Sequence, residues 1–186
     1  MSRKFGQTWW GQQWLNAFNG IDHGNRLPRG ARYARSGAVS GIAIGSRGVE
    51  ARVQGTRLSP YRVRISLKLF TPAQQKTILR AVQQNPALLS RLLNRQLPAQ
   101  LLTVLDQKRI SLFPDSWQDM HATCTCPDWA VPCKHIAAVI YLIASEIDKN
   151  PFMVFTLHDL DLVEALEKAT GFTAASLTPP PLFATV

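Results

Sequence analysis

HATCTCPDWAVPCKH, residues 121–135, holds all three cysteines of the 186-residue chain. One residue separates Cys124 from Cys126. After six intervening residues, Cys133 and His135 repeat that spacing. Residues i and i+2 of an extended strand point to the same side, so the first two thiols can face one point. Three thiolates and one imidazole are a recurring tetrahedral ligand set for structural zinc. The stretch therefore indicates a Cys3His metal centre, because clustered cysteines beside a histidine favour metal over a disulfide.

A helix is predicted directly after Pro132, with Cys133 and His135 in its first turn. Apolar residues then recur at helical spacing: Ile136, Val139, Ile140, Ile143 and Ile147. The amide N–H groups and the positive end of this helix would stabilise the Cys133 thiolate. Four ligands close the coordination sphere, whereas a catalytic zinc site needs an open position and a general base.

Other interpretations of the cluster stay open. The cysteines could be free thiols buried in a core. Cys124 and Cys126 could form a redox pair, although Cys133 and His135 would then be unexplained. His121 could replace His135 as the fourth ligand, but His135 lies with Cys133 at the helix start.

Three residues beside the ligands have predicted roles. Asp128 is expected to form a turn. Trp129 is expected to pack beneath the loop, and Lys134, between two ligands, to be exposed and able to touch phosphate.

The pattern C-x-C-x6-C-x-H followed by an apolar helix resembles the SWIM-type zinc finger. Further stretches resemble a family of small bacterial SWIM zinc-finger proteins: TWWGQQWLNAF (8–18), RGARYARSGAV (29–39), EARVQGTRLSPYRVRI (50–65) and DKNPFMVFTL (148–157). The resemblance implies that Cys124, Cys126, Cys133 and His135 bind Zn²⁺, without catalysis. It also implies binding to DNA or to proteins, with a Swi/Snf-type helicase-like ATPase as partner, because such an ATPase is commonly encoded beside these proteins. The Pro-rich end, TAASLTPPPLFATV (173–186), matches no motif, and family members often run longer.

Positive charge is concentrated in the first part of the chain. The net charge is +9, from 21 Lys and Arg against 12 Asp and Glu. Residues 1–70 hold 12 of the basic residues and only two acidic ones, whereas residues 116–186 hold three basic and eight acidic residues. Ten of those first 12 are Arg, the side chain best suited to bidentate phosphate contact. The predicted nucleic-acid contacts are Arg26, Arg29, Arg32, Arg35, Arg52, Arg62, Arg64, Lys68 and Lys134. A solvated basic face with no ligand is the alternative.

Hydrophobic periodicity predicts the remaining elements. An aromatic helix within residues 5–19 docks into the core. Strands at 39–45, 49–54 and 61–69 form an antiparallel meander with one buried and one basic face. Three short helices follow within residues 72–108, then a short strand at 110–113. A strand or extended segment is expected at 150–157 and a last amphipathic helix at 160–169.

The predicted fold class is therefore α+β. A basic antiparallel sheet with flanking helices is joined to a C-terminal zinc-bound ββα finger. The expected segments are 1–70, the aromatic and basic N-terminal helix and meander; 71–115, the helices; 116–158, the SWIM-type finger; and 159–186, the C-terminal helix and Pro-rich tail.

Several functional classes lack support in the sequence. There is no P-loop, no G-x-S-x-G and no deaminase zinc signature. No run of 18 apolar residues and no apolar leader segment is present, so we expect a cytoplasmic protein without a membrane partner. The function predicted is that of a non-catalytic zinc protein that binds nucleic acid, in particular DNA, as an accessory factor. The alternative is a protein-interaction adaptor for a helicase-like ATPase.

Overall fold

Helices and strands are interspersed along the chain in the computed structural model, which describes residues 4–19, 21, 25–45, 47–94, 96–129 and 131–170. In chain order the elements are α1 (Trp9–Asn16), α2 (Arg26–Arg35), β1 (Val39–Gly45), β2 (Gly48–Val53), β3 (Tyr61–Leu67), α3 (Pro72–Gln83), α4 (Pro86–Leu93), α5 (Ala99–Asp106), the 3-10 helix η1 (Trp117–Asp119), β4 (Met120–Cys124), α6 (Lys134–Lys149), α7 (Met153–Thr156) and α8 (Leu162–Thr170). The four strands form one antiparallel sheet in the order β1-β2-β3-β4. The predicted α+β class is confirmed.

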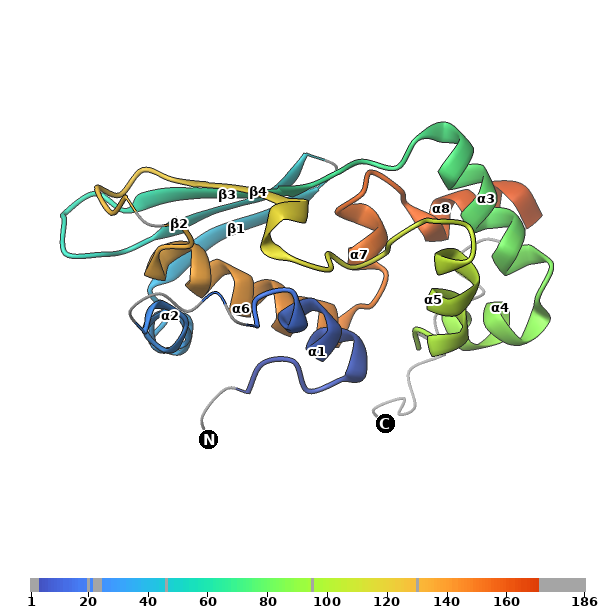
Figure 1. Cartoon of the computed structure of the whole chain (residues 1–186), viewed down its shortest axis with the longest axis horizontal. Coiled ribbons are helices and arrows are strands. Elements are labelled where there is room, and N and C mark those ends of the chain that lie inside the picture. Colours follow the sequence, from blue (N-terminus) through green and yellow to red (C-terminus); the bar gives the residue numbers. More distant parts are fainter. Residues whose placement is uncertain are drawn as a thin grey trace, which may run out of the picture.

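The sheet has one buried and one exposed face, as the period-2 pattern predicts. The inward side chains of β2 and β3 are buried: Val49, Ala51, Val53, Tyr61, Val63, Ile65 and Leu67. The alternate side chains are exposed: Glu50, Arg52, Arg62 and Arg64. Helices α1, α2 and α6 lie together on one side of the sheet (Figure 1), and α6 contacts β3 and β4. The basic face of the sheet therefore points away from these helices.

Helix α6 lies at the centre of the fold. Most of its side chains are buried: His135, Ile136, Ala137, Ala138, Val139, Ile140, Leu142, Ile143, Ala144, Ser145 and Ile147. Helix α2 packs against it so closely that a Cβ on Gly30 would overlap Ala137. Buried Ala31 and Ala34 continue this contact surface of small residues. The close approach brings the arginines of α2 next to the N-terminal end of α6.

Helix α1 docks its aromatic side chains against α6, as predicted. Trp14 is 1 % exposed, and its indole N–H donates to the carbonyl of Ile140 at 3.1 Å. The indole N–H of Trp10 donates to the carbonyl of Ile147 at 3.0 Å. The buried indole of Trp14 and the half-buried indole of Trp10 thus each have a hydrogen-bond acceptor.

The helices α3, α4 and α5 lie with α8 beyond one end of the sheet (Figure 1). Helix α3 begins with a capping box, in which the Thr71 hydroxyl accepts from the Gln74 N–H and the Gln74 side chain accepts from the Thr71 N–H. The prediction of three helices in this part of the chain is confirmed.

Three predicted strand segments differ from the structure. Strand β3 ends at Leu67 rather than at 69, because the Phe70 N–H donates to the carbonyl of His158, so the chain leaves the sheet. Residues 110–113 are buried at three positions but form no strand, since the Leu112 carbonyl accepts from the ring of His158 instead of from a neighbouring strand. Residues 150–157 contain α7, because Asn150 accepts from the N–H of Phe152 and starts a turn.

The four predicted segments contribute to one continuous cluster of buried apolar side chains, which includes Trp14, Val63, Leu101, Ile140 and Leu166. Strand β4, from the predicted finger segment, pairs with β3 of the N-terminal segment. Among the described residues, the predicted finger segment 116–158 therefore holds one strand, β4, before α6, and the second strand expected there is supplied by β3. Among the described residues, no helix combines the length and the apolar character needed to cross a membrane. The Pro-rich end lies outside the described residues.

Candidate metal centre

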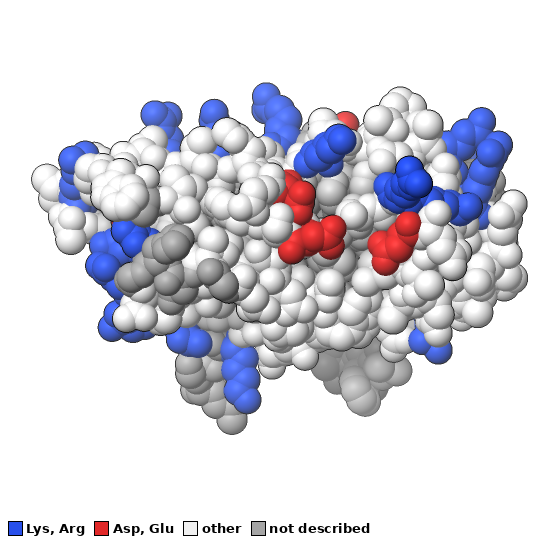
Figure 2. Space-filling model, viewed as in Figure 1, with Lys and Arg blue, Asp and Glu red and all other residues white. Residues whose placement is uncertain are grey.

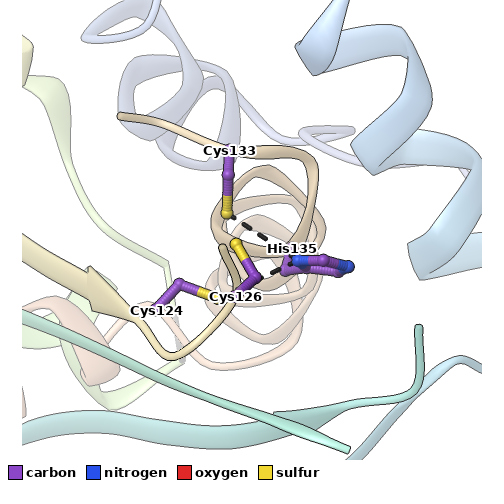
Figure 3. A group of neighbouring side chains, drawn as sticks. All are labelled: Cys124, Cys126, Cys133 and His135. Atoms are coloured by element: carbon purple, nitrogen blue, oxygen red, sulfur yellow. Dashed lines mark hydrogen bonds between the residues drawn. The ribbon is translucent and has the colours of Figure 1, made fainter. Parts of the chain in front are cut away.

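Strand β4 and helix α6 bring the three cysteines and His135 together (Figure 3). Cys124 is the last residue of β4, Cys126 follows in the bend, and Cys133 is the N-cap of α6, so that His135 falls in its first turn. The candidate ligand atoms of the four residues all lie within 4.8 Å of one another. Thiolates about 2.3 Å from a tetrahedral Zn²⁺ would be about 3.8 Å apart. The four donors thus fit a closed tetrahedral zinc site.

The ring of His135 presents its Nδ1 atom to the sulfurs. This atom lies 3.9 Å from Cys124 Sγ and 3.9 Å from Cys133 Sγ. The ring packs against Tyr61 at a centroid distance of 4.6 Å and against Tyr33 at 5.6 Å. The Nε2 atom is buried and has no hydrogen-bond partner among the described residues. We therefore assign Nδ1 as the ligand atom, with the ring held by aromatic packing.

The three cysteine thiols differ in pKa. The pKa of Cys133 is lowered to about 4 by hydrogen bonds from the Cys124 thiol, from His135 and from the Ile136 N–H of the helix. The pKa of Cys124 is raised because its proton is engaged with Cys133 and because the thiol is partly buried. Burial also raises the pKa of Cys126. Cys133 therefore ionises first, and zinc binding must release the protons of the other two thiols.

Two predicted positions beside the ligands are resolved by the structure. His121 is exposed on β4 and lies outside the ligand group. Of the two histidines considered, His135 is therefore the fourth candidate ligand. The prediction for Trp129 is wrong, because its side chain is 89 % exposed. The rings of Tyr33 and Tyr61 already pack against His135 behind the centre, so the aromatic contacts expected of Trp129 come from two other elements.

Some of the basic residues predicted to contact nucleic acid form ion pairs or ring contacts within the protein. Arg26 pairs with Asp128 at 3.4 Å, and Arg64 pairs with Glu50 at 3.0 Å. Lys134, expected to be exposed, is half-buried with its ammonium group 5.2 Å from the ring centre of Tyr33. A register that sets Glu50 opposite Arg64 and a loop that brings Asp128 to α2 account for these differences.

The remaining predicted arginines and lysine are exposed: Arg29, Arg32, Arg35, Arg52, Arg62 and Lys68. Arg35 also lies over the ring of Phe5, at 5.4 Å from its centre. Sequence reasoning left out Arg57, whose guanidinium lies 5.8 Å from the ring centre of Tyr61, the ring that packs on His135. Tyr61 follows Arg57 by four residues in the sequence. That spacing indicates the contact only when the course of the loop between them is known.

Comparison with known families agrees with this geometry. Residues 107–144, which include all four candidate ligands, match the family profile described as SWIM zinc finger. The chain carries a SWIM zinc finger. The SWIM finger here includes β4 and the first part of α6, and its ligand group is consistent with zinc.

The chain is also similar to the uncharacterized protein Rv2102 of Mycobacterium tuberculosis. The two are 35 % identical over 173 residues, which are 93 % of this chain and 62 % of that protein. The chain thus spans less than two thirds of the length of this relative. No solved structure matches the chain.

Proposed function

We propose that this protein is a non-catalytic DNA-binding accessory factor whose zinc centre is structural. The observation that carries the proposal is the placement of Arg52 directly opposite Arg62 across β2 and β3. Like charges directly opposite on one sheet face are destabilising. Both side chains are exposed, and no carboxylate within 4 Å is recorded for either among the described residues. A phosphate bound between them would relieve the repulsion and accept hydrogen bonds from both guanidinium groups.

Helix α2 adds a second set of cations to the same end of the molecule. Arg29, Arg32 and Arg35 are exposed along it. In Figure 2, Lys and Arg occur at both ends of the visible face, and at the end that holds the sheet and α2 no Asp or Glu is visible among them. A surface of this kind attracts polyanions through charge, independently of sequence.

The zinc centre supports the proposal because it connects the basic face of the sheet with helix α2. Its ligands come from β4, which pairs with β3, and from α6, which packs against α2. A closed Cys3His set leaves no coordination position for a substrate or an activated water. We therefore propose no catalytic role for the metal.

Salt-dependent binding tests the proposal. The variant Arg52→Gln with Arg62→Gln should bind duplex DNA more weakly across sequences. Its slope of log affinity against log salt should be shallower by about two, since each phosphate contact contributes about 0.9 on B-DNA. The matched control is Lys76→Gln with Arg80→Gln, which removes the same charge from the exposed side of α3. Equal slopes for the wild type and the Arg52 and Arg62 variant would refute the role of the sheet.

One cavity favours a second candidate function, that of an adaptor for a helicase-like ATPase. A cavity of about 320 Å³ is lined by Trp9, Trp10, Arg91, Leu97 and Pro98, among others. Trp9 is 39 % exposed at this site, and aromatic residues with Arg are typical anchors at protein interfaces. A pull-down with the ATPase, with and without nuclease, distinguishes direct contact from a bridge of nucleic acid. Direct contact should weaken with Arg91→Glu and survive nuclease treatment.

A further inference from the structure

We infer that the protein binds single-stranded nucleic acid by stacking a base on Trp129, an inference that rests on the nucleic-acid binding proposed above. Trp129 lies in the loop between the second and third zinc ligands, and its side chain is 89 % exposed. Trp14 is buried and Trp10 half-buried against α6, and both indoles donate hydrogen bonds to it. An indole in water offers a large flat π-face without packing partners, which is the group that proteins use to stack unpaired bases.

The chain just before Trp129 is held by contacts to β3 and to α2. Thr125, directly before the second ligand, donates its N–H to the Arg62 carbonyl and accepts the Arg62 N–H with its hydroxyl, both at 3.0 Å. Asp128, the neighbour of Trp129, pairs with Arg26 at 3.4 Å. With zinc bound, Cys126 and Cys133 would hold the two ends of the loop at one point. A side chain presented from a fixed loop loses less entropy when it binds a ligand.

Cations lie on the two sides of this loop. On the strand side, Arg62 is hydrogen-bonded through its backbone to the loop, and Arg57 lies over the Tyr61 ring that packs on His135. On the helix side, Arg26 contacts Asp128, and the exposed Arg29 is one turn further along α2. The contacts of this part of the chain thus involve arginines of both β3 and α2. An exposed indole together with arginines is the combination that follows a single-stranded backbone while stacking its bases.

These features favour a single strand over a duplex and over a protein partner. In a duplex the faces of the bases are covered by their neighbours, so an indole gains little there, whereas phosphate contacts remain equally available. The core of a protein interface is apolar and depleted of charge. The elements that flank Trp129 instead present guanidinium groups.

Four zinc-loaded proteins test the inference: the wild type, Trp129→Ala, Trp129→Phe and Leu58→Ala. Leu58 is the matched control, because it is a fully exposed apolar residue of the β2–β3 loop. Affinity is measured for labelled oligothymidylate and for a duplex of the same length at one salt concentration. Zinc content and thermal unfolding are measured in parallel, and both should be unchanged, since neither side chain is buried.

Trp129→Ala should weaken binding to oligothymidylate by about 5- to 150-fold, the range for loss of one stacked base. Trp129→Phe should recover part of the loss. Affinity for the duplex, and both affinities of Leu58→Ala, should stay within about twofold of the wild type. Equal oligothymidylate affinity for the wild type and Trp129→Ala would overturn the inference.

The arginine variant separates this inference from the proposed function. If Arg52→Gln with Arg62→Gln weakens binding and Trp129→Ala does not, stacking is wrong and the proposed function stands. If the wild type binds neither DNA, both are wrong. If Trp129→Ala loses binding only to the purified helicase-like ATPase, the indole is a protein contact and the inference is overturned.

Discussion

Asp148 holds the start of α1 to the end of α6, and its substitution should loosen this junction. Its carboxylate accepts three hydrogen bonds: from the Gln7 N–H at 2.9 Å, from the Thr8 N–H at 2.9 Å and from the Thr8 hydroxyl at 2.6 Å. The approach is so close that a Cβ on Gly11 would overlap the carboxylate. Thr8 in turn caps α1 by accepting from the Gly11 N–H. One side chain thus fixes both the position and the first turn of the helix.

Asp148→Asn keeps the shape but puts an amide N–H₂ opposite the Gln7 N–H. One hydrogen bond is lost outright and the other two lose the charge of the acceptor. Hydrogen bonds to charged groups contribute about 1.5–3 kcal/mol each. Since the junction is partly exposed, we expect a loss of about 2–4 kcal/mol in the free energy of unfolding. At about 2–4 °C per kcal/mol for a chain of this size, the melting temperature should fall by about 4–16 °C.

Thermal unfolding of the zinc-loaded protein, followed by far-ultraviolet circular dichroism, measures this effect. The control is Glu164→Gln, which removes an exposed pair with Lys168 one turn away on α8. A pair this exposed to solvent contributes little to stability, so the melting temperature should hardly change. Equal melting temperatures for the two variants would refute the assignment of Asp148 as the anchor of α1.

Three further outcomes follow from the structure. The purified protein should carry about one zinc per chain, measured by atomic absorption, and Cys126→Ser should lose both the metal and stability, because metal binding and folding are linked. Gly30→Leu should lower the melting temperature by several degrees, because the side chain would have to separate α2 from α6. A smaller effect than that of Gly45→Leu, at a glycine of β1 with no close neighbour and no positive φ, would contradict this packing. Burial lowers the pKa of His158 below 6.5, so the unfolded state binds the proton more strongly, and stability that is complete above about pH 6.5 is lost as the pH falls. Urea unfolding at pH 7.5 and 5.5 should therefore show a larger loss for the wild type than for His158→Gln, with acid effects on the zinc site common to both.

The sequence predicted those parts of the fold that depend on local periodicity. The alternation in 49–54 and 61–69 identified the buried face of the sheet as far as Leu67, whereas Leu69 is exposed. The spacing of the cysteines identified the metal centre, because a ligand set is defined by residue type and separation. Charge pairing could not be predicted in this way. Glu50 meets Arg64 only because of the register between β2 and β3, and Asp128 meets Arg26 only because α2 folds beside the finger. The rings that pack on His135 could not be predicted either, because Tyr33 and Tyr61 come from two elements that are distant in the sequence.

The ring stack at His135 also connects the binding of zinc with the binding of an anion. His135 contributes Nδ1 to the ligand group, while its ring packs on Tyr61 and so supports Arg57. Thr125, one residue after the first ligand, is hydrogen-bonded to Arg62. If zinc occupancy strengthens the hold on an anion at these arginines, the anion must strengthen the hold on zinc by the same factor. Bound polyanion would then lower the fraction of zinc that a competing chelator removes at equilibrium, without any contact between a phosphate and the metal.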